Sequence, residues 1–500
     1  MRRIVMPVLL LVIALAALFG SNQLSDQLHD DLGEVATDDT VPPGVGTPLV
    51  STRRLTSVLA PSLTEPDFFD TLDELMASSP VSACLHVTQN GSSFDPRENG
   101  YTNIPVSPSD ATLLLTLATA HQTLGPDHTF TTSVQSVVPM EGGVINGDVY
   151  LVGGGDPLLL TREFAATLEL GQNQLRTPIE ELAQDLVDDG LALVTGAVVG
   201  DATRYDDLFY GSWPEETIES QNIGTLLALQ FDDGWRQFPV SDPELEAEET
   251  ATQANEEVVG YVVADDPPWY AAALFDDMLE ARDVVIRRTP RSEGVPEGEE
   301  LYILASIESA PLSAHYRQIL DNRDIETIEM LIKEIGWVTT GVGSTQAGLQ
   351  AMNNTLARVG INSDQFQPLK FDDGSGLDPD NVATCPVFTA LLDSNEYAPL
   401  FRELLPTAAE AGPLQSRFTS VENPGRIRAL SGGTSGTSVM MGYIDIGRGQ
   451  ELTFAFIANQ QGTLDNQALK ELESRVVGHL ASLEAKPTLD DIQLAPLRLG

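Results

Sequence analysis

Apolar and polar residues alternate with different periods along the chain, and these periods predict a protein that mixes helices with strands. Residues 81–91 alternate as a strand does and end on Asn90-Gly91, a pair typical of a tight hairpin turn. Residues 111–124 are small and apolar, contain neither glycine nor proline, and are followed by a Gly-Pro pair. That stretch predicts a buried helix with a defined end.

The rest of the chain predicts two kinds of region. Short alternating segments separated by Gly and Asp turns begin near Thr129, so a β-rich region is expected from there. Helical spacing returns at residues 312–335 and 345–359. Residues 425–460 read as consecutive antiparallel strands, and residues 465–484 as a closing helix. We find no internal repeat, and the order of elements indicates one discontinuous domain interrupted by another.

The N-terminus carries the features of an export signal. A basic start, with arginines at the second and third positions, precedes an apolar run over residues 4–19. Residues 1–20 therefore read as a signal peptide, or as a signal anchor if they are retained. Residues 21–61 are rich in Asp, Thr, Pro, Gly and Ser and predict a disordered linker. We expect an exported, extracytoplasmic protein, in the periplasm or at the cell surface, whose contact with a membrane is limited to residues 4–19.

The composition is strongly acidic, and this narrows the range of partners. The chain has 74 Asp and Glu residues against 27 Lys and Arg residues, and its formal net charge is −47. Nucleic acid is excluded as an expected partner because its phosphates would be repelled. Only four residues are lysines, namely Lys333, Lys370, Lys470 and Lys486. We interpret the acidic surface as a solvated one.

The cysteines and histidines give limited information on their own. Cys84 and Cys385 are the two cysteines; in an exported chain they permit a disulfide, and the alternative is two buried free thiols. The six histidines show neither H-E-x-x-H nor H-x-H spacing, and no G-x-S-x-G elbow occurs. Residues 431–438 are rich in Gly and Ser but lack the lysine of a phosphate-binding loop, so they read as a hairpin turn. We expect no cofactor and no metal.

Six segments occur in a characteristic order: LGPDHTFTT, INGDVYLVGGGDPLL, GAVVGDATRYDDLF, FDDGSGLDPDN, LLPTAAEAGPLQSRF and the hairpin GRIRA…SGGTSG…MGYI. Together, over residues 81–484, they resemble the class C penicillin-binding proteins. These are exported serine D-alanyl-D-alanine carboxypeptidases and endopeptidases that trim cell-wall peptides. The resemblance implies an α+β, multi-domain fold. In it, a transpeptidase/β-lactamase-like domain, an antiparallel sheet flanked by helices, is interrupted by a β-rich insertion.

The resemblance also implies domain boundaries. Residues 62–128 and 300–486 would form the two parts of the transpeptidase-like domain, and residues 129–299 the inserted β-rich domain or domains. Residues 487–500 would be a tail. Cys84 and Cys385 then lie one in each part of the split domain, and we predict that they pair and join the two parts.

Enzymes of this family depend on three motifs, S-x-x-K, S-x-N and K-T-G. The first serine is the nucleophile, and the first lysine takes its proton. The S-x-N residues relay protons and orient the substrate amide, and K-T-G binds the terminal carboxylate of the substrate. Seven residues of this chain stand at these positions: Asp110 and Leu113 for S-x-x-K, Arg323 and Ile325 for S-x-N, and Leu430, Ser431 and Gly432 for K-T-G.

No other part of the sequence restores the missing motifs. No lysine lies three residues after a serine, and none is followed by Thr-Gly or Ser-Gly. Ser220-Gln221-Asn222 fits S-x-N, but it lies within the expected insertion, far along the chain from the helix that should carry the motif. The catalytic residues of the family are therefore lost from the sequence.

Three hypotheses for function remain. The first is a catalytically inactive family member with a binding or scaffolding role in the cell envelope, whose partners are peptidoglycan peptides or envelope proteins. The second is an active serine-type D-Ala-D-Ala carboxypeptidase or endopeptidase in peptidoglycan metabolism, and the motif losses argue against it. The third is a structural envelope protein, which the sequence does not separate from the first. If the alignment holds, five of these residues, Asp110, Leu113, Arg323, Ile325 and Leu430, should converge on one cleft, and Asp110 and Arg323 could then form an ion pair that fills the former site.

Overall fold

The computed structural model describes residues 56–77, 81–94, 101–167, 175–208, 213, 218, 223–239, 259–410, 412–419, 421–433, 436–460 and 466–485. The chain divides into a unit of residues 1–63 and a unit of residues 64–500, and the second is described below. The predicted signal segment (1–20) and tail (487–500) lie outside the described residues. Among the helices that are described, none combines the length and apolar character needed to cross a membrane.

A five-stranded antiparallel sheet is formed from both ends of this unit, in the order β15-β16-β17-β1-β2. Its strands are β1 (Ser82–Gln89), β2 (Ser92–Ser93), β15 (Ile427–Gly432), β16 (Thr437–Gly447) and β17 (Gln450–Asn459). The predicted hairpin turn is present, and Asn90 and Gly91 adopt the positive φ angles (53° and 73°) that such a turn requires. β1 pairs along its whole length with β17, from Ser82 opposite Asn459 to Gln89 opposite Leu452.

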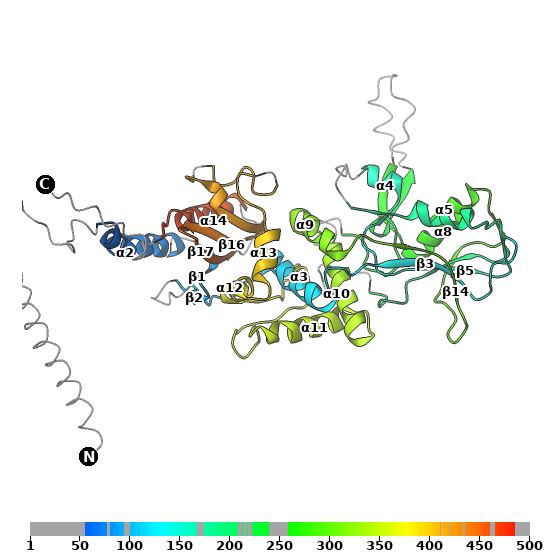
Figure 1. The fold of residues 1–500 in the computed structure, drawn as a ribbon, viewed down its shortest axis with the longest axis horizontal. Coiled ribbons are helices and arrows are strands. Elements are labelled where there is room, and N and C mark those ends of the chain that lie inside the picture. Colours follow the sequence, from blue (N-terminus) through cyan, green and yellow to red (C-terminus); the bar gives the residue numbers. More distant parts are fainter. Residues whose placement is uncertain are drawn as a thin grey trace, which may run out of the picture. The chain divides into compact units, whose positions relative to one another are not determined.

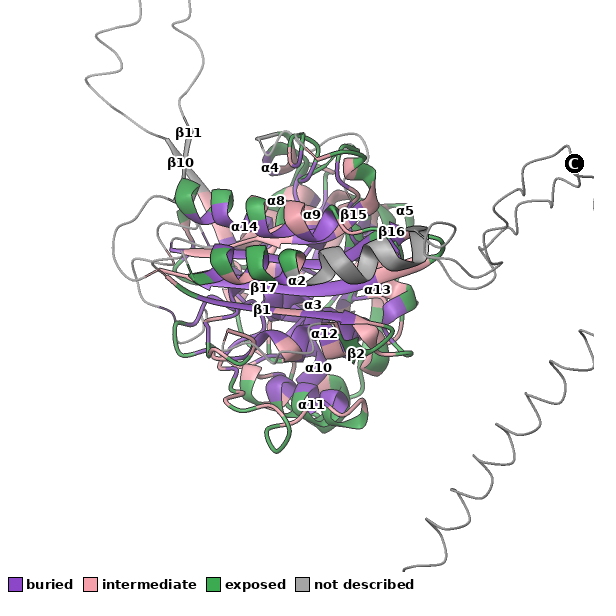
Figure 2. Cartoon of the chain, turned by 90° about the vertical axis from the view of Figure 1, so that its left-hand side faces the viewer, coloured by how far each residue is buried: buried purple, intermediate pink, exposed green. Residues whose placement is uncertain are grey.

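Helices cover both faces of this sheet, as Figure 2 shows for the buried strand β17. One face packs against α2 (Thr56–Ala77) and α14 (Asn466–Ala481), and the other against α3 (Thr112–Thr123) and α12 (Cys385–Asp393). Further helices of this part are α9 (Leu312–Asn322), α10 (Ile325–Thr340), α11 (Thr345–Arg358) and α13 (Ala398–Leu404). The predicted α+β fold, with an antiparallel sheet flanked by helices, is confirmed.

The helix expected at residues 111–124 is the centre of the core. A short 3-10 turn, η1 (Ser109–Ala111), leads into α3. Leu113, Leu114, Leu115 and Leu117 are each at most 1% exposed. A helix that is apolar on every side is stable only when it is surrounded by other elements. This explains why α3 packs against α10 and α11 on one side and lies next to the sheet on the other.

Residues 129–308 contain a second, mixed sheet in the order β13-β9-β5-β3-β14. Its strands are β3 (Thr131–Ser136), β5 (Val149–Val152), β9 (Val198–Asp201), β13 (Arg291–Ser292) and β14 (Tyr302–Glu308). The strands of this region outside that sheet are β4 (Val144–Ile145), β6 (Leu159–Leu160), β7 (Thr177–Pro178), β8 (Leu193–Val194), β10 (Trp235–Pro239), β11 (Val259–Val263) and β12 (Val285–Ile286). The helices α4 (Arg162–Thr167), α5 (Ile179–Asp188) and α8 (Pro267–Glu280) also belong here (Figure 1), and α5 and α8 share an apolar core with the mixed sheet.

Two boundaries differ from the sequence-based expectations. β14 pairs with β3, so a boundary at residue 299 would cut this sheet, and we propose that the insertion ends after Glu308. Helix α2 begins at Thr56, inside the segment expected as linker. Near its C-terminal end, Leu72, Leu75 and Met76 stand at helical spacing and are buried. The helix extends from these buried residues back toward the N-terminus.

The expected helical stretch 312–335 is two helices. Arg323 adopts a left-handed conformation (φ 54°, ψ 52°) after α9. Asp324 then caps α10, because its carboxylate accepts the backbone N–H of Thr327 at 3.0 Å. Apolar spacing continues through the break because both helices bury a face in the same core, so periodicity alone does not reveal it.

Candidate active-site region

Asp110 lies within η1, the 3-10 turn that leads into α3, and its carboxylate is surrounded by the chain. The residue is 5% exposed. Its Oδ2 accepts the backbone N–H of Gly433 at 2.8 Å and lies 3.4 Å from Nη1 of Arg323. These contacts bring together residues at or next to the three aligned motif positions, which are more than 100 residues apart in sequence.

Arg323 reaches this carboxylate from the break between α9 and α10. Its side chain is 49% exposed, whereas that of Asp110 is 8% exposed. An ion pair with one partner half in water contributes modestly to stability. Of the two contacts, the hydrogen bond from the N–H of Gly433 is the shorter, at 2.8 Å against 3.4 Å. The carboxylate that accepts this bond is shielded from water.

The glycine of the third motif position is required by this arrangement. A Cβ atom on Gly432 would lie 2.3 Å from Oδ2 and 2.7 Å from Cβ of Asp110. Contacts this short do not occur between real atoms, so β15 approaches Asp110 closely only because residue 432 has no side chain. The Asp110 side chain fills the space beside the end of β15.

Leucines occupy the two aligned lysine positions, and both are part of the core. Leu113 and Leu430 are each 1% exposed and belong to the same apolar cluster. Ile325 lies apart from them: it packs with a different cluster that includes Leu226 and Met330. The structure thus brings Asp110, Arg323 and the end of β15 together and places Ile325 elsewhere.

Ser431 makes contacts on the other face of the sheet. Side chains of neighbouring strand residues alternate between faces, and Leu430 faces the core around α3. Ser431 accepts a hydrogen bond from Nη1 of Arg417 at 2.9 Å. Arg417 also bonds Glu473 of α14, which is fully buried. Sequence reasoning missed Arg417 as a site residue, although it lies within the matched segment LLPTAAEAGPLQSRF, because it belongs to none of the three catalytic motifs.

An acidic loop, residues 371–381, packs directly beside Asp110. Gly376 has a φ of +88°, and a Cβ atom there would lie 2.0 Å from the carbonyl oxygen of Ser109. Glu329 of α10 holds this loop, since its Oε1 accepts the N–H groups of Gly374 and Ser375 at 2.9 and 2.7 Å. Burial, followed by the nearby charge of Asp373, raises the pKa of Glu329 to about 8.

Lys333 of α10 has a structural role and is not available as a base. Its side chain is 1% exposed. Nζ donates to Oδ1 of Asp206 at 2.7 Å and to the carbonyl oxygens of Leu208 and Leu226 at 2.7 and 3.0 Å. Burial lowers its pKa, and Asp206 opposes that shift. With all three ammonium hydrogens engaged, Lys333 holds Asp206, Leu208 and Leu226 against α10.

Two groups of carboxylates within the described residues are close enough to share a cation. One is Asp276, Asp277 and Glu280 on α8, and the other is Asp372, Asp378 and Asp380 in the acidic loop. In the second group, the ammonium of Lys370 already lies 2.5 Å from Asp372. Neither group includes Asp110.

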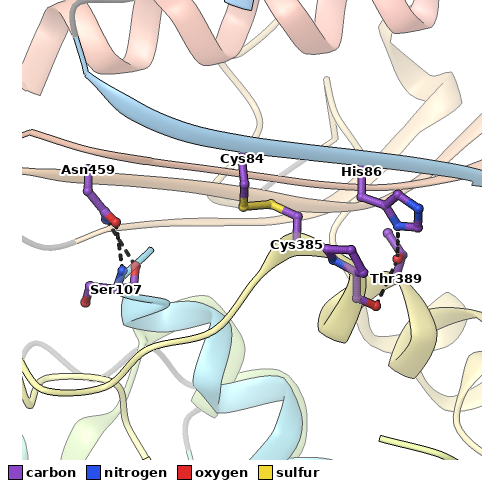
Figure 3. The surroundings of a disulfide bond; sticks show 7 residues. Cys84, His86, Ser107, Cys385, Thr389 and Asn459 are labelled. Carbon is purple, nitrogen blue, oxygen red and sulfur yellow. Dashed lines mark hydrogen bonds between the residues drawn. A yellow bond between two sulfur atoms is a disulfide. The ribbon is translucent and has the colours of Figure 1, made fainter. Parts of the chain in front are cut away.

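Two links attach other parts of the domain to the central sheet (Figure 3): a disulfide holds the start of α12, and the side-chain amide of Asn459 holds the segment that leads to Asp110. Cys84 of β1 and Cys385 at the start of α12 are bonded, with their Cα atoms 5.8 Å apart, and both are fully buried. The side chain of Asn459 accepts the N–H of Ser107 at 2.7 Å and donates to its carbonyl oxygen at 3.1 Å. The two hydrogen bonds of Asn459 hold the chain just before η1 at the end of β17.

Comparison with known proteins agrees with the fold. The family model described as D-Ala-D-Ala carboxypeptidase 3 (S13) matches residues 99–259 and 250–483. The chain is 27% identical over 432 residues to the D-alanyl-D-alanine carboxypeptidase of Actinomadura sp. (strain R39), covering 74% of this chain and 76% of that protein. It is 25% identical over 486 residues to Carboxypeptidase DacB of Mycolicibacterium smegmatis, covering 94% of both.

Solved structures show the same fold. The crystal structure of penicillin binding protein 4 from Haemophilus influenzae superposes with a TM-score of 0.66 at 18% identity, covering 82% of this chain and 99% of that chain. The transpeptidase/β-lactamase-like fold and the resemblance to class C penicillin-binding proteins are therefore confirmed, and with more than half of its length matched by the family model, the chain belongs to the D-Ala-D-Ala carboxypeptidase 3 (S13) family.

Proposed function

We propose that this protein is a catalytically inactive member of its family that binds or scaffolds peptidoglycan-related ligands in the cell envelope. The observation that carries the proposal is the state of the Asp110 carboxylate. It stands at the aligned nucleophile position and is held by the Gly433 N–H and by Arg323. A carboxylate engaged in this way is a poor nucleophile toward an amide.

The surroundings of Asp110 support the same conclusion. A nucleophilic serine needs a neighbouring base, and the aligned base position carries Leu113, which is buried in apolar surroundings. Sites of acyl transfer use backbone N–H groups to stabilise the oxyanion that develops on the substrate. Here the N–H of Gly433 already donates to Asp110, so it is not free for a substrate oxygen.

The family relationship supports the envelope context. The Actinomadura relative is by name a carboxypeptidase that acts on D-alanyl-D-alanine, and an apolar N-terminal segment is consistent with export. A fold retained without its catalytic residues is suited to hold a cell-wall peptide without cleaving it. We therefore propose peptidoglycan peptides or envelope proteins as partners.

Penicillin labelling tests the inactive state, since penicillins acylate the activated serine of this family. The purified protein should form no stable adduct with a fluorescent penicillin and should release no D-alanine from a D-Ala-D-Ala peptide. The Actinomadura relative serves as the positive control. Stoichiometric labelling that maps to any serine would overturn the proposal.

Binding to immobilised cell-wall peptides tests the proposed role separately. Retention of the protein on peptides that end in D-Ala-D-Ala, but not on the same matrix without peptide, is expected. A protein that neither labels nor binds would instead have a purely structural role in the envelope.

A further inference from the structure

A polar groove lies at one end of the central sheet, away from Asp110. Its volume is ≈ 530 Å³, within the range typical of small-ligand sites. It is lined by residues of α13, β15 and the β16–β17 hairpin, among them Arg402, Arg426, Arg428, Tyr443, Gln450 and Glu451. Arg428 and Gly432 are four residues apart on β15, a distance of about 13 Å along a strand. The groove and the Asp110 contacts are thus separate sites.

Three arginines gather in this groove although the chain has 27 basic residues against 74 acidic ones. Arg402 pairs with a carboxylate, since its Nε lies 2.9 Å from Oε1 of Glu451. Arg428 donates to the carbonyl oxygen of Arg402 at 2.5 Å, and Arg426 donates to the carbonyl oxygens of Asp445 and Leu483. Carbonyl groups hold a guanidinium in place without neutralising its charge.

The charges that line the groove leave an excess of one positive charge. Arg402, Arg426 and Arg428 face Asp445 and Glu451. An excess of one charge fits a carboxylate better than a phosphate dianion, which the two acidic side chains would repel more strongly. The planar fork of a guanidinium also matches the two oxygens of a carboxylate.

Part of the groove is ordered before any ligand binds. The guanidinium of Arg402 lies over the ring of Tyr443, 4.7 Å from its centroid. That ring is 1% exposed, and its hydroxyl donates to the carbonyl oxygen of Leu392 at 2.8 Å. An arginine held by a fixed ring and by one Nε bond loses little side-chain entropy when its remaining N–H groups bind a ligand.

We propose that this groove binds an acidic peptide, with a peptide carboxylate held between the guanidiniums of Arg402 and Arg428. The side-chain amides of Asn90 and Gln450 line the same groove and offer both donors and acceptors to the peptide backbone. The site is separate from Asp110, so it does not depend on whether the protein hydrolyses peptides. It gives this acidic protein a place to hold an acidic partner.

The test uses the full-length protein and a rhodamine-labelled tetrapeptide amide, Glu-Ala-Glu-Ala-NH2, with Gln-Ala-Gln-Ala-NH2 as the neutral control, so that neither peptide carries a C-terminal carboxylate. Fluorescence anisotropy at low salt should show binding of the acidic peptide and at least tenfold weaker binding of the neutral one. Arg402→Gln should weaken binding of the acidic peptide by about tenfold or more, the effect of losing a charge-assisted hydrogen bond. Arg475→Gln removes an exposed arginine outside this groove and should change affinity less than about twofold.

Two further variants and a competing anion complete the test. Arg428→Gln is informative only if it folds, because Arg428 also bonds α13; Arg402→Lys keeps the charge but loses the planar fork and should bind with intermediate affinity. Equal binding of both peptides, or an unchanged affinity of Arg402→Gln, would overturn the proposal. Displacement of the peptide by an equal concentration of inorganic phosphate would also overturn it, in favour of a general anion site. Penicillin labelling should be the same in the wild type and Arg402→Gln, which separates this test from that of the proposed function.

Discussion

The carboxylate of Asp110 lies 3.4 Å from the guanidinium of Arg323, although the two residues are 213 positions apart in the sequence. The family resemblance assigns each of them to the position of a catalytic serine. If this assignment holds, a pair of opposite charges occupies the place where two hydroxyl groups would cooperate. The same Asp110 oxygen also accepts the N–H of Gly433, so this small network links α3, the α9–α10 break and the end of β15.

The ion pair can be measured by a double-mutant cycle. Arg323→Ala should lower the free energy of unfolding by about 0.5–1 kcal/mol, because the arginine is half exposed and the carboxylate keeps its backbone donor. Alanine and arginine are strained alike at a φ of 54°, so backbone effects cancel. In the Asp110→Asn background the same substitution should have almost no effect, since Arg323 no longer has a carboxylate to pair with. Equal effects in both backgrounds, in urea denaturation, would show that the pair contributes nothing.

The close approach of β15 to Asp110 gives a second prediction. Gly432→Ala should destabilise the protein by roughly 1–3 kcal/mol, because the new methyl group meets the Asp110 side chain at 2.3 Å. The penalty should shrink in the Asp110→Ala background, where the carboxylate is gone and only the Cβ contact at 2.7 Å remains. Gly425→Ala is a suitable control, since a Cβ atom there has no neighbour closer than 4.0 Å. A penalty of the same size with and without the Asp110 carboxylate would contradict the packing described here.

Local patterns predicted local structure well. The helix at residues 111–124 and the Asn90-Gly91 turn follow from composition and turn chemistry, and both are present. The pairing of β1 with β17 was not predictable from local pattern, because residues that lie opposite each other in this pair, such as Cys84 and Ile457, are far apart in the chain. Only the family resemblance placed both strands in one domain.

The residues of the site were also predictable from the sequence only in part. The motif register located Asp110 and Arg323, because side chains leave a signature in the sequence. It did not locate the N–H of Gly433, since every residue but proline carries such a donor. Ser431 was aligned as a site residue, yet it bonds Arg417 on the face toward α14. Strand alternation decides which face a residue occupies, and the motif alone did not reveal that the hydroxyl lies opposite the Leu430 side chain.

The disulfide should make a large contribution to stability. Cys84 and Cys385 close a loop with a sequence separation of 301 residues, and the chain-entropy model assigns about 6 kcal/mol to a loop of this size. The free energy of unfolding of the Cys84→Ser/Cys385→Ser double variant should therefore be lower by a corresponding amount. The variant should unfold at a lower urea concentration than the wild type. Thiol labelling of the wild type in denaturant without reductant should detect no free cysteine. Two labelled thiols per chain in the protein recovered from the exported fraction would contradict the pairing.

The buried carboxyl group of Glu329 should make stability fall as pH rises. Its folded pKa of about 8 lies above the value of about 4.3 for an unfolded glutamate. The folded state therefore favours the protonated form: the stabilising contribution is complete below about pH 4 and is lost as the pH rises through 8. Its size is on the order of a few kcal/mol.

A variant that cannot titrate isolates this contribution of Glu329. Glu329→Gln keeps an oxygen for the N–H groups of Gly374 and Ser375, so the free energy of unfolding should fall less steeply between pH 5 and 8 than in the wild type. Glu403→Gln, at an exposed position, should leave the slope unchanged. Identical slopes for Glu329→Gln and the wild type, measured by urea denaturation across this range, would mean that Glu329 is already ionised in the folded protein. The acidic loop beside Asp110 would then be held by a charged carboxylate.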